Sequence, residues 1–330
     1  CLTASSSLMA ANSAPVIALP AGVVVTNVAK PTLSGTAEAN SSLTFYDGAT
    51  QIASGVPVTG GGSWSFTLLA DLSLGAHSIT ARATDPYGNT GPASAVKSIT
   101  FDNVPAVLTI SAPAAGAFLS TATPSVAYSS NEGGSATCQV DSGAQPACGS
   151  PTSWTTPSLS QGPHTVTVRW TDPAGNVTPT SRSFNVDTVL PTASITAPAV
   201  DGTLVNSQRP SIGFSVDDTD STGTTTGLSE CRVVGVSSFS PCDPPYVTPQ
   251  LTDGTYSVEL RHTDKAGNPR TVSRSIKVDT TLPTVAISSP APDAYTLPNP
   301  TVSFSVTDAN PGTNWCQMDG GAEAPCSSNI

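Results

Sequence analysis

Residues 164–191 read HTVTVRWTDPAGNVTPTSRSFNVDTVLP, and this stretch decides the fold class. His164, Val166, Val168 and Trp170 alternate with polar residues, which is the period-2 pattern of a half-buried β-strand. The DPAGN segment that follows combines Pro, Gly, Asp and Asn, all of which favour a tight turn. A second alternating run comes next and ends in a short link. The stretch therefore predicts a β-hairpin with a link to another unit.

The same cassette occurs three times, because residues 77–105 and 256–283 repeat its strand, turn and link. The aspartates in the three links are 85 and then 92 residues apart, which is the size of one sandwich domain. We therefore expect a tandem array of similar modules. Its predicted parts are an N-terminal tail (1–13), complete modules at 14–103, 104–188 and 189–280, and a partial module at 281–330.

The composition of the 330 residues favours an all-β chain. It is 38% hydrophobic and only 11% charged, with 30 Pro and 27 Gly. Any window long enough for a helix that shows apolar residues at helical spacing also contains a Pro or a Gly. Short alternating segments separated by turn residues predict β-sandwiches.

The net charge of −11 bears on the possible partners. Nucleic acid would be repelled, and no basic stripe offsets the repulsion, so we expect no nucleic-acid partner. Divalent cations suit an acidic chain better. No run of 18 apolar residues occurs, and this predicts the absence of a membrane-spanning helix.

Six of the seven cysteines fall as one close pair in each of three units. Six cysteines allow 15 pairings in general, but the recurrence favours local pairing. Each such disulfide would stabilise its module by about 3 kcal/mol. Zinc is a weak alternative, because each unit offers only two thiols. Disulfides indicate an oxidising compartment and hence export. The expected pairs are Cys138–Cys148, Cys231–Cys242 and Cys316–Cys326.

The seventh cysteine is Cys1, followed by the low-complexity segment LTASSSLMA. This beginning is similar to what remains when a bacterial lipoprotein signal is cleaved before its cysteine. It therefore predicts a lipid anchor at Cys1, which would be the chain's contact with a membrane. An intermolecular disulfide at Cys1 and an arbitrary start of the sequence are the alternatives.

Two sets of sequence segments resemble known repeats. Residues 31–38 (PTLSGTAE), 42–48 (SLTFYDG), 62–67 (GSWSFT) and the cassette at residue 77 resemble the bacterial Ig-like repeats of large surface adhesins. The segment CQVDSGAQPAC at 138–148 resembles the disulfide-bearing bacterial Ig-like repeat, although the third module lacks its Asp-Gly turn. The resemblance implies a seven-stranded Ig-type sandwich in each unit, in an elongated rod.

Two sets of aspartates are candidate calcium ligands. Carboxylates and backbone carbonyls are the hard oxygen ligands that calcium prefers, and related aspartates bind calcium in the adhesin repeats that these modules resemble. The alternative is structural: each turn Asp would form an Asx turn and each link Asp would cap a strand. The set comprises Asp85, Asp172 and Asp264 in the turns and Asp102, Asp187 and Asp279 in the links.

The sequence offers little for catalysis, and we expect no enzyme. His77 and His164 occupy one repeat position that Tyr256 takes in the third module, which indicates partly buried strand residues. His262 is expected at the surface. Asp217, Asp218 and Asp220 are expected in a solvated polar loop.

These observations predict an exported structural protein, a stalk or filament subunit at a bacterial surface. Its partners would be further Ig-like repeats or copies of itself. One alternative is an adhesin module that binds glycan or protein, with the loop at 217–227 as the first place to probe. Another is an accessory part of a secreted enzyme. The partial fourth unit would be completed either by more of the same chain or by strands from another chain.

Overall fold

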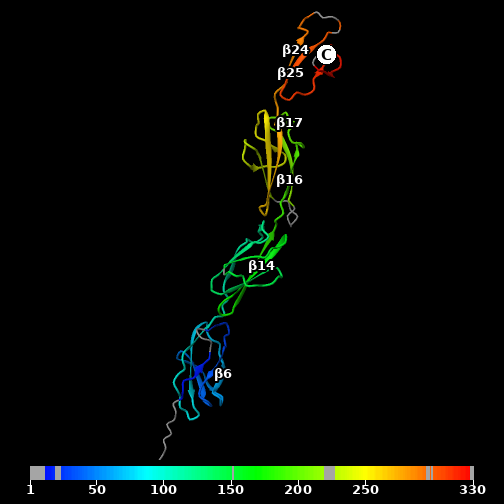
Figure 1. Ribbon diagram of the computed structural model, residues 1–330. Coiled ribbons are helices and arrows are strands. Elements are labelled where there is room, and N and C mark those ends of the chain that lie inside the picture. The colour runs from blue at the N-terminus through cyan, green and yellow to red at the C-terminus, as the bar shows by residue number, and fades with distance from the viewer. Residues whose placement is uncertain are drawn as a thin grey trace, which may run out of the picture. The chain divides into compact units, whose positions relative to one another are not determined.

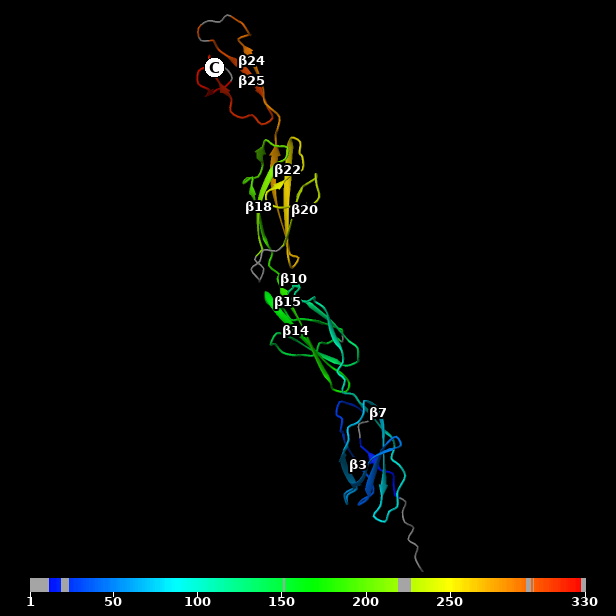
Figure 2. The ribbon, with the colours of Figure 1, turned by 180° about the vertical axis from the view of Figure 1, so that it is seen from behind.

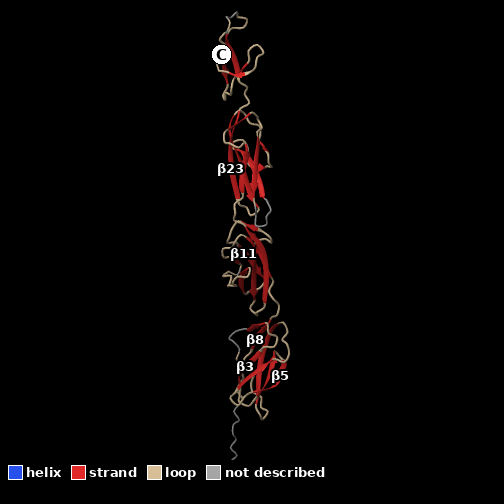
Figure 3. Cartoon of the chain, turned by 90° about the vertical axis from the view of Figure 1, so that its right-hand side faces the viewer, coloured by secondary structure: helices blue, strands red, loops and turns tan. Residues whose placement is uncertain are grey.

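The structure is a computed structural model that describes residues 12–18, 24–150, 152–218, 227–294, 298 and 300–327. In this part of the chain all regular secondary structure is β-strand, drawn in red in Figure 3. Two compact units form, of residues 1–117 with 122–185 and of residues 118–121 with 186–330. The all-β prediction is confirmed. Cys1 and Asp220 lie outside the described residues.

The segment predicted as the first module (14–103) has two sheets, with the strand orders β1-β3-β6 and β2-β8-β7-β4-β5. β2 pairs with β8 in parallel, while the pairs around β3, β4 and β7 are antiparallel. The strands are β1 (Val16–Ile17), β2 (Val24–Thr26), β3 (Thr32–Thr36), β4 (Ser42–Asp47), β5 (Thr50–Pro57), β6 (Ser63–Thr67), β7 (Gly75–Thr84) and β8 (Lys97–Phe101).

Apolar side chains from both sheets form the core of the first module. Leu33 of β3 and Phe45 of β4 are fully buried, as is Ile79 of β7. The ring of Phe45 meets Trp64 edge-on and stacks on Phe66, with both centroid distances 5.2 Å. The two inner faces therefore interdigitate as in a β-sandwich.

The segment predicted as the second module (104–188) also has two sheets around the predicted hairpin, the larger one with four strands. β14 and β12 pair antiparallel, and β15 lies next to β14 in the same sheet. His164, Val166, Val168 and Trp170 of β14 are all buried, so the predicted period-2 pattern is present. The strands are β9 (Leu108–Ala112), β10 (Phe118–Leu119), β11 (Ser125–Ser130), β12 (Ser135–Val140), β13 (Ser153–Thr155), β14 (Gly162–Thr171) and β15 (Val177–Val186). The other sheet has the order β13-β11-β9.

The segment predicted as the third module (189–280) has two sheets, with the strand orders β16-β18-β21 and β17-β23-β22-β19-β20. Its strands are β16 (Thr192–Ala197), β17 (Thr203–Val205), β18 (Ser211–Asp217), β19 (Gly227–Val233), β20 (Ser240–Pro241), β21 (Tyr246–Val247), β22 (Gly254–Asp264) and β23 (Pro269–Val278). The long hairpin β22–β23 covers Ile195 and Phe214 with Leu260 and Ile276, all four of which are buried. Figures 1 and 2 show the strands of this module from opposite sides.

The C-terminal segment (281–330) contains two short pairs in its described residues. β24 (Thr284–Ser289) pairs antiparallel with β25 (Ser303–Thr307), and β26 (Trp315–Cys316) pairs antiparallel with β27 (Ala324–Pro325).

Each of the three cysteine pairs forms a disulfide. The bonds join Cys138 to Cys148, Cys231 to Cys242 and Cys316 to Cys326, over sequence separations of 10, 11 and 10 residues. They close the loop after β12, the loop after β19 and the loop between β26 and β27. These are the pairs that the sequence predicts.

Two expectations about polar residues are wrong. His262 is only 2% exposed rather than a surface residue, because it continues the inward-facing alternation of Val258 and Leu260 along β22. Asp218 directly follows β18 and is 4% exposed, so it does not belong to a solvated loop. Asp217, in contrast, is exposed as expected.

Candidate metal centres

Two groups of three acids bring their carboxylates together. In each group one carboxylate oxygen per residue lies within 4.8 Å of the others. Each group has a turn aspartate, a link aspartate and a third acid that follows a strand, which we call the strand-end acid. The first cluster is Asp102, Glu132 and Asp172, and the second cluster is Asp187, Asp218 and Asp264.

The turn aspartate is held by its own hairpin turn. Oδ1 of Asp172 accepts hydrogen bonds from the backbone N–H groups of Ala174 and Asn176, both at 2.9 Å, and Oδ2 accepts one from Asn176 Nδ2 at 2.9 Å. Gly175 supplies the φ of 94° that the turn requires. Burial pushes the pKa of Asp172 upward, but these hydrogen bonds outweigh it and lower the pKa. The turn therefore favours a charged carboxylate.

The link aspartate is fixed by an Asx turn and by the asparagine of the next hairpin turn. Asp102 Oδ1 accepts a hydrogen bond from Val104 N at 2.9 Å, and Asn176 Nδ2 donates to the Asp102 carbonyl at 3.0 Å. In the third module Asn268 Nδ2 makes the same bond to the Asp187 carbonyl at 2.9 Å. The hairpin turn is thus tied to the link that precedes its own module.

The strand-end acid comes from the strand that lies beside the first strand of the module. Glu132 follows β11, and Asp218 follows β18 at the equivalent place. The local sequence pattern around these two acids does not connect them with the aspartates. A usable signal was present, since both stand at the end of a strand that pairs with the strand after the link.

The two clusters differ in burial. Asp187, Asp218 and Asp264 are 4%, 4% and 5% exposed, whereas Asp172 is the buried member of the first cluster. Carboxylates at such distances repel one another, and burial strengthens the repulsion. A bound cation or a shared proton relieves this cost. A donor set of oxygens alone, with no thiol or imidazole, fits calcium better than zinc.

Asp85 and Asp279 are not members of a described cluster. Asp85 makes the same turn as Asp172, with hydrogen bonds at 2.8 Å from the N–H groups of Tyr87 and Asn89. Asn12 Nδ2 donates to the Asn89 carbonyl at 2.6 Å, so this part of the expected tail packs on the turn. Asp279 Oδ1 accepts a hydrogen bond from Thr281 N at 3.2 Å.

His77 and His164 are buried strand residues, and each also forms an ion pair with an aspartate, which the sequence did not predict. His164 Nδ1 lies 2.8 Å from Asp141 Oδ2, and its Nε2 lies 2.9 Å from the Ser160 carbonyl. In the first module His77 lies 2.5 Å from Asp47 and 2.8 Å from the Ser73 carbonyl. With an acceptor at each ring nitrogen, the doubly protonated imidazolium is the favoured form.

Two segments of the chain match family models. Residues 23–103 match a model described as a bacterial Ig-like domain, and residues 231–280 match a second model with the same description. These two segments therefore carry bacterial Ig-like domains, as the sequence resemblance indicated. No curated protein matches the chain.

Several solved structures of tandem modules are similar to the chain. The tetra-tandem repeat in the extending region of a large adhesion protein is 20% identical over 93% of this chain and 87% of its own, with a TM-score of 0.29. A Ca²⁺-stabilised adhesin that helps an Antarctic bacterium reach out and bind ice is 16% identical over 92% and 85%, with a TM-score of 0.33. The fibronectin(III)-like modules of Clostridium thermocellum CbhA are 18% identical over 52% and 94%, with a TM-score of 0.35.

Proposed function

We propose that the chain is a structural part of an exported bacterial surface protein, a stalk or filament subunit whose links are stiffened by calcium. The observation that carries the proposal is the acid cluster, formed once in the second module and once in the third. In each cluster one carboxylate belongs to the link and two belong to the module that follows.

A calcium ion in such a cluster would join the link to the module. Asp102, Glu132 and Asp172 would hold it in the second module, and Asp187, Asp218 and Asp264 in the third. Calcium supplies the positive charge that three neighbouring carboxylates require. The Asx turns at the link and turn aspartates hold the carboxylates in place, so the structural role and the metal role do not compete.

The rest of the chain supports a mechanical function. The links are short and end in Pro, which limits bending between modules. Disulfides within the modules suit an exported protein. The proposed array consists of modules at 14–103, 104–188 and 189–280, with 281–330 beginning a fourth. The proposal assigns no catalytic step to the chain.

The test is a calcium titration of the metal-stripped chain, followed by thermal unfolding. Calcium at 100 times its Kd is expected to stabilise a module by about 2.7 kcal/mol. Asp187→Asn removes one ligand charge and keeps the oxygen that accepts the Val189 N–H, whereas Asp243→Asn changes an exposed acid outside both clusters. The first variant is expected to lose the calcium response of the third module, and the control is expected to keep it.

A second measurement addresses the mechanical role. Small-angle scattering is expected to give a larger maximum dimension with calcium than with chelator, because links without cation are free to bend. Unfolding and dimension that are both unchanged by a chelator contradict the proposal.

A further inference from the structure

The two links of a module are attached to its first and its last strand. In the second module the link that starts at Asp102 leads into β9, and β15 ends at the link of Asp187. Tension on the two links therefore pulls β9 toward its amino end and β15 toward its carboxyl end. The contacts between these two strands decide how the module resists tension.

Three side chains at alternate positions of β15 hold β9, each by donating to a main-chain carbonyl. Because β9 is an edge strand of its sheet, these side chains cover its unpaired edge. The bonds advance two residues at a time in the same direction along both strands, which therefore run parallel. They are Thr178 Oγ1 to the Ala106 carbonyl at 2.7 Å, Thr180 Oγ1 to the Leu108 carbonyl at 3.3 Å and Arg182 Nη2 to the Ile110 carbonyl at 2.5 Å.

Tension loads these three bonds together. Parallel strands that are pulled in opposite directions slide past one another, so the bonds between them have to break at the same time. Strands that separate from one end lose their bonds one after another and resist less. Because forced unfolding is governed by the unfolding rate, we expect that rate to depend on these bonds.

The third module shares the arginine bond but not the middle threonine. Arg274 Nη2 donates to the Ile195 carbonyl at 3.0 Å, as Arg182 does to Ile110. Val272 stands at the place of Thr180 and has no hydroxyl to donate. The last strand of the third module is therefore held differently.

Asp201, just before β17, supplies a contact of its own to the last strand of the third module. Its Oδ1 accepts a hydrogen bond from Ser275 N at 2.8 Å, next to the bond from Gly202 N to the Ser275 carbonyl at 3.0 Å. β17 then pairs with β23 in parallel. In the second module Ala115 precedes the equivalent glycine, and its side chain accepts no hydrogen bond.

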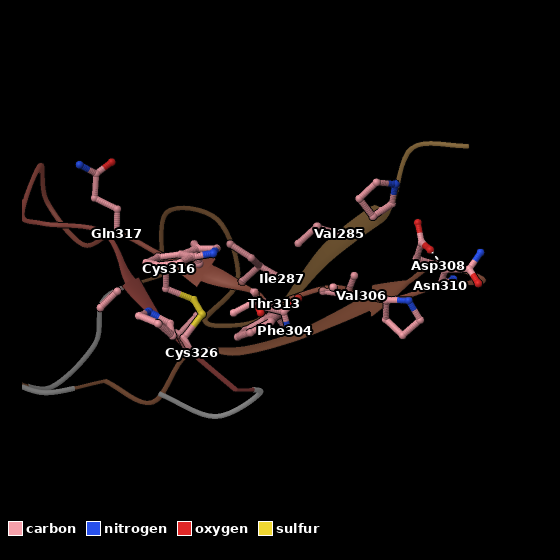
Figure 4. Close-up of a pocket in the computed structure, with 18 of the residues that line it drawn as sticks. Val285, Ile287, Phe304, Val306, Asp308, Asn310, Thr313, Cys316, Gln317 and Cys326 are labelled. Atoms are coloured by element: carbon pink, nitrogen blue, oxygen red, sulfur yellow. Dashed lines mark hydrogen bonds between the residues drawn. A yellow bond between two sulfur atoms is a disulfide. The ribbon is translucent and has the colours of Figure 1, made fainter. Parts of the chain in front are cut away.

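The chain beyond the third module is attached to the same last strand by side chains. Lys277 Nζ of β23 donates to Asn310 Oδ1, and Asn310 Nδ2 donates to Asp279 Oδ2 in the link. Figure 4 shows Asn310 beside Asp308, just after β25. Tension applied beyond the link therefore enters the module at the carboxyl end of β23.

We propose that the last strand bears the tension in the second and third modules, and that the two modules hold this strand by different side chains. In the second module Thr178 and Thr180 hold β15 to β9, and in the third module Asp201 holds β23. The inference rests on the mechanical role proposed above and names the contacts that fulfil it.

The test stretches the 330-residue chain between its two ends at constant force, in the presence of a chelator. The link aspartates that flank the third module are 92 residues apart, against 85 for the second, and its disulfide loop is one residue longer. Unfolding of the third module therefore releases about 20 Å more chain, which identifies it. The rate of each unfolding step is measured.

Thr180→Val gives the second module the residue of the third and removes one hydroxyl. It is expected to speed the unfolding of the second module about threefold to tenfold, while Thr180→Ser keeps the hydroxyl and is expected to keep the rate. Thr137→Val is the matched control, because Thr137 accepts a hydrogen bond from Gln145 at 2.8 Å on β12, away from β9 and β15. This control is expected to change the rate by less than about twofold.

Asp201→Ala gives the third module the residue of the second. It is expected to speed the unfolding of the third module by a similar factor and to leave the second module unchanged. Asp201→Asn keeps the oxygen that accepts the Ser275 N–H and is expected to unfold at nearly the original rate. Asp243→Ala changes an exposed acid between β20 and β21 and serves as the control.

Two results overturn the proposal. One is an equal increase of the second module's unfolding rate in Thr180→Val and Thr137→Val, which would assign the effect to general stability. The other is an unchanged rate of the third module in Asp201→Ala. Both are measured without calcium, so they are distinct from a failure of the proposed function, which appears as a missing response to calcium.

Discussion

The second and third modules have similar strand orders, apart from the extra edge strand β20 of the third, but hold the start of their long hairpins differently. His164 and Tyr256 occupy the same position, and each bonds the carbonyl four residues earlier, at 2.9 Å to Ser160 and 3.1 Å to Thr252. His164 also forms an ion pair with Asp141, and the residue equivalent to Asp141 in the third module is Val234. The shared bond to the backbone therefore defines the module, and the charge is an addition to it.

Another backbone contact is shared by these two modules. Arg182 donates to the Ile110 carbonyl at 2.5 Å, and Arg274 donates to the Ile195 carbonyl at 3.0 Å. The contacts that recur in both modules join one side chain to a main-chain carbonyl, and a main-chain carbonyl is present whatever the sequence. Contacts between two side chains differ between the modules, because both residues must be kept for such a contact to recur.

The largest expected effect concerns a feature that the two modules share. Replacing both cysteines of either disulfide by serine, Cys138 with Cys148 or Cys231 with Cys242, is expected to cost about 3 kcal/mol in its module. The costs are expected to be equal, because the two loops differ by one residue. Hydrogen exchange resolved by module measures both. Unequal costs would show that the different turns between the cysteines contribute to stability.

The difference in burial between the two acid clusters is expected to give the next largest effect, a difference in how strongly calcium stabilises the second and third modules. At a calcium concentration 100 times the Kd of the second cluster, we expect calcium to stabilise the third module by about 2.7 kcal/mol. We expect the second module to be stabilised less at the same concentration, because two acids of the first cluster are partly exposed. Asp187→Asn and Asp102→Asn, measured in parallel by hydrogen exchange with and without calcium, provide the comparison. Equal calcium responses would mean that burial does not set the affinity.

The sequence predicted the β class, the hairpin turns and the disulfides, because each depends on residues close together in the chain. It identified Asp102, Asp172, Asp187 and Asp264 singly but did not group them. Grouping required knowing that a link residue meets the turn of the module after it, some 70 to 80 residues later. Such contacts follow from strand order and not from local pattern.

His262 shows the opposite case, in which a local signal was sufficient but was not used. Val258, Leu260 and His262 stand at alternate positions of one strand, so all three face inward. Its Nδ1 lies 2.9 Å from the Ser229 hydroxyl inside the module.

The pH dependence of the free energy of unfolding is expected to differ between the second and third modules by a smaller amount. Burial pushes the pKa of His164 down, but the hydrogen bonds to Asp141 and Ser160 outweigh it and place the pKa above the ordinary 6.5. Stability from a raised pKa is present below the unfolded value and is lost as the pH rises through the folded value. We expect the second module to lose about 1 kcal/mol on this rise, since solvent screens the half-exposed Asp141.

At low pH the stability changes in the opposite direction, since the contribution of Asp141 is lost as the pH falls. Burial pushes the pKa of Asp141 up, but its bonds to His164 and Thr165 lower it below the ordinary 3.8, so this contribution is lost as the pH falls through the lowered value. The double variant His164→Tyr with Asp141→Asn removes both charges, and Asn tolerates the φ of 50° at position 141. Amide exchange of β14 between pH 5 and about pH 9 is expected to lose its excess pH dependence in this variant. A persistent difference would assign the effect to another group.

The smallest expected effect lies on the surface of the third module. Two guanidinium groups lie over the ring of Phe239, with Cζ of Arg232 4.4 Å and Cζ of Arg261 4.2 Å from the ring centroid. The two arginines also pair with Glu259 and Glu230. Phe239→Ala is expected to cost the third module about 0.5 kcal/mol, and the second module nothing. A denaturant titration followed by exchange in β22 measures it. A loss above about 2 kcal/mol would show that the ring is a core residue.

The division of each acid cluster between a link and the module after it bears on how such a chain grows by gene duplication. A copied stretch that begins and ends at equivalent points in two links carries one complete turn, one strand-end acid and one link aspartate. Inserted in tandem, it restores every cluster at both of its borders, whatever the number of copies. Recombination between points that are not equivalent, in contrast, leaves a turn without its link, so the clusters are kept only when the length changes by whole repeats.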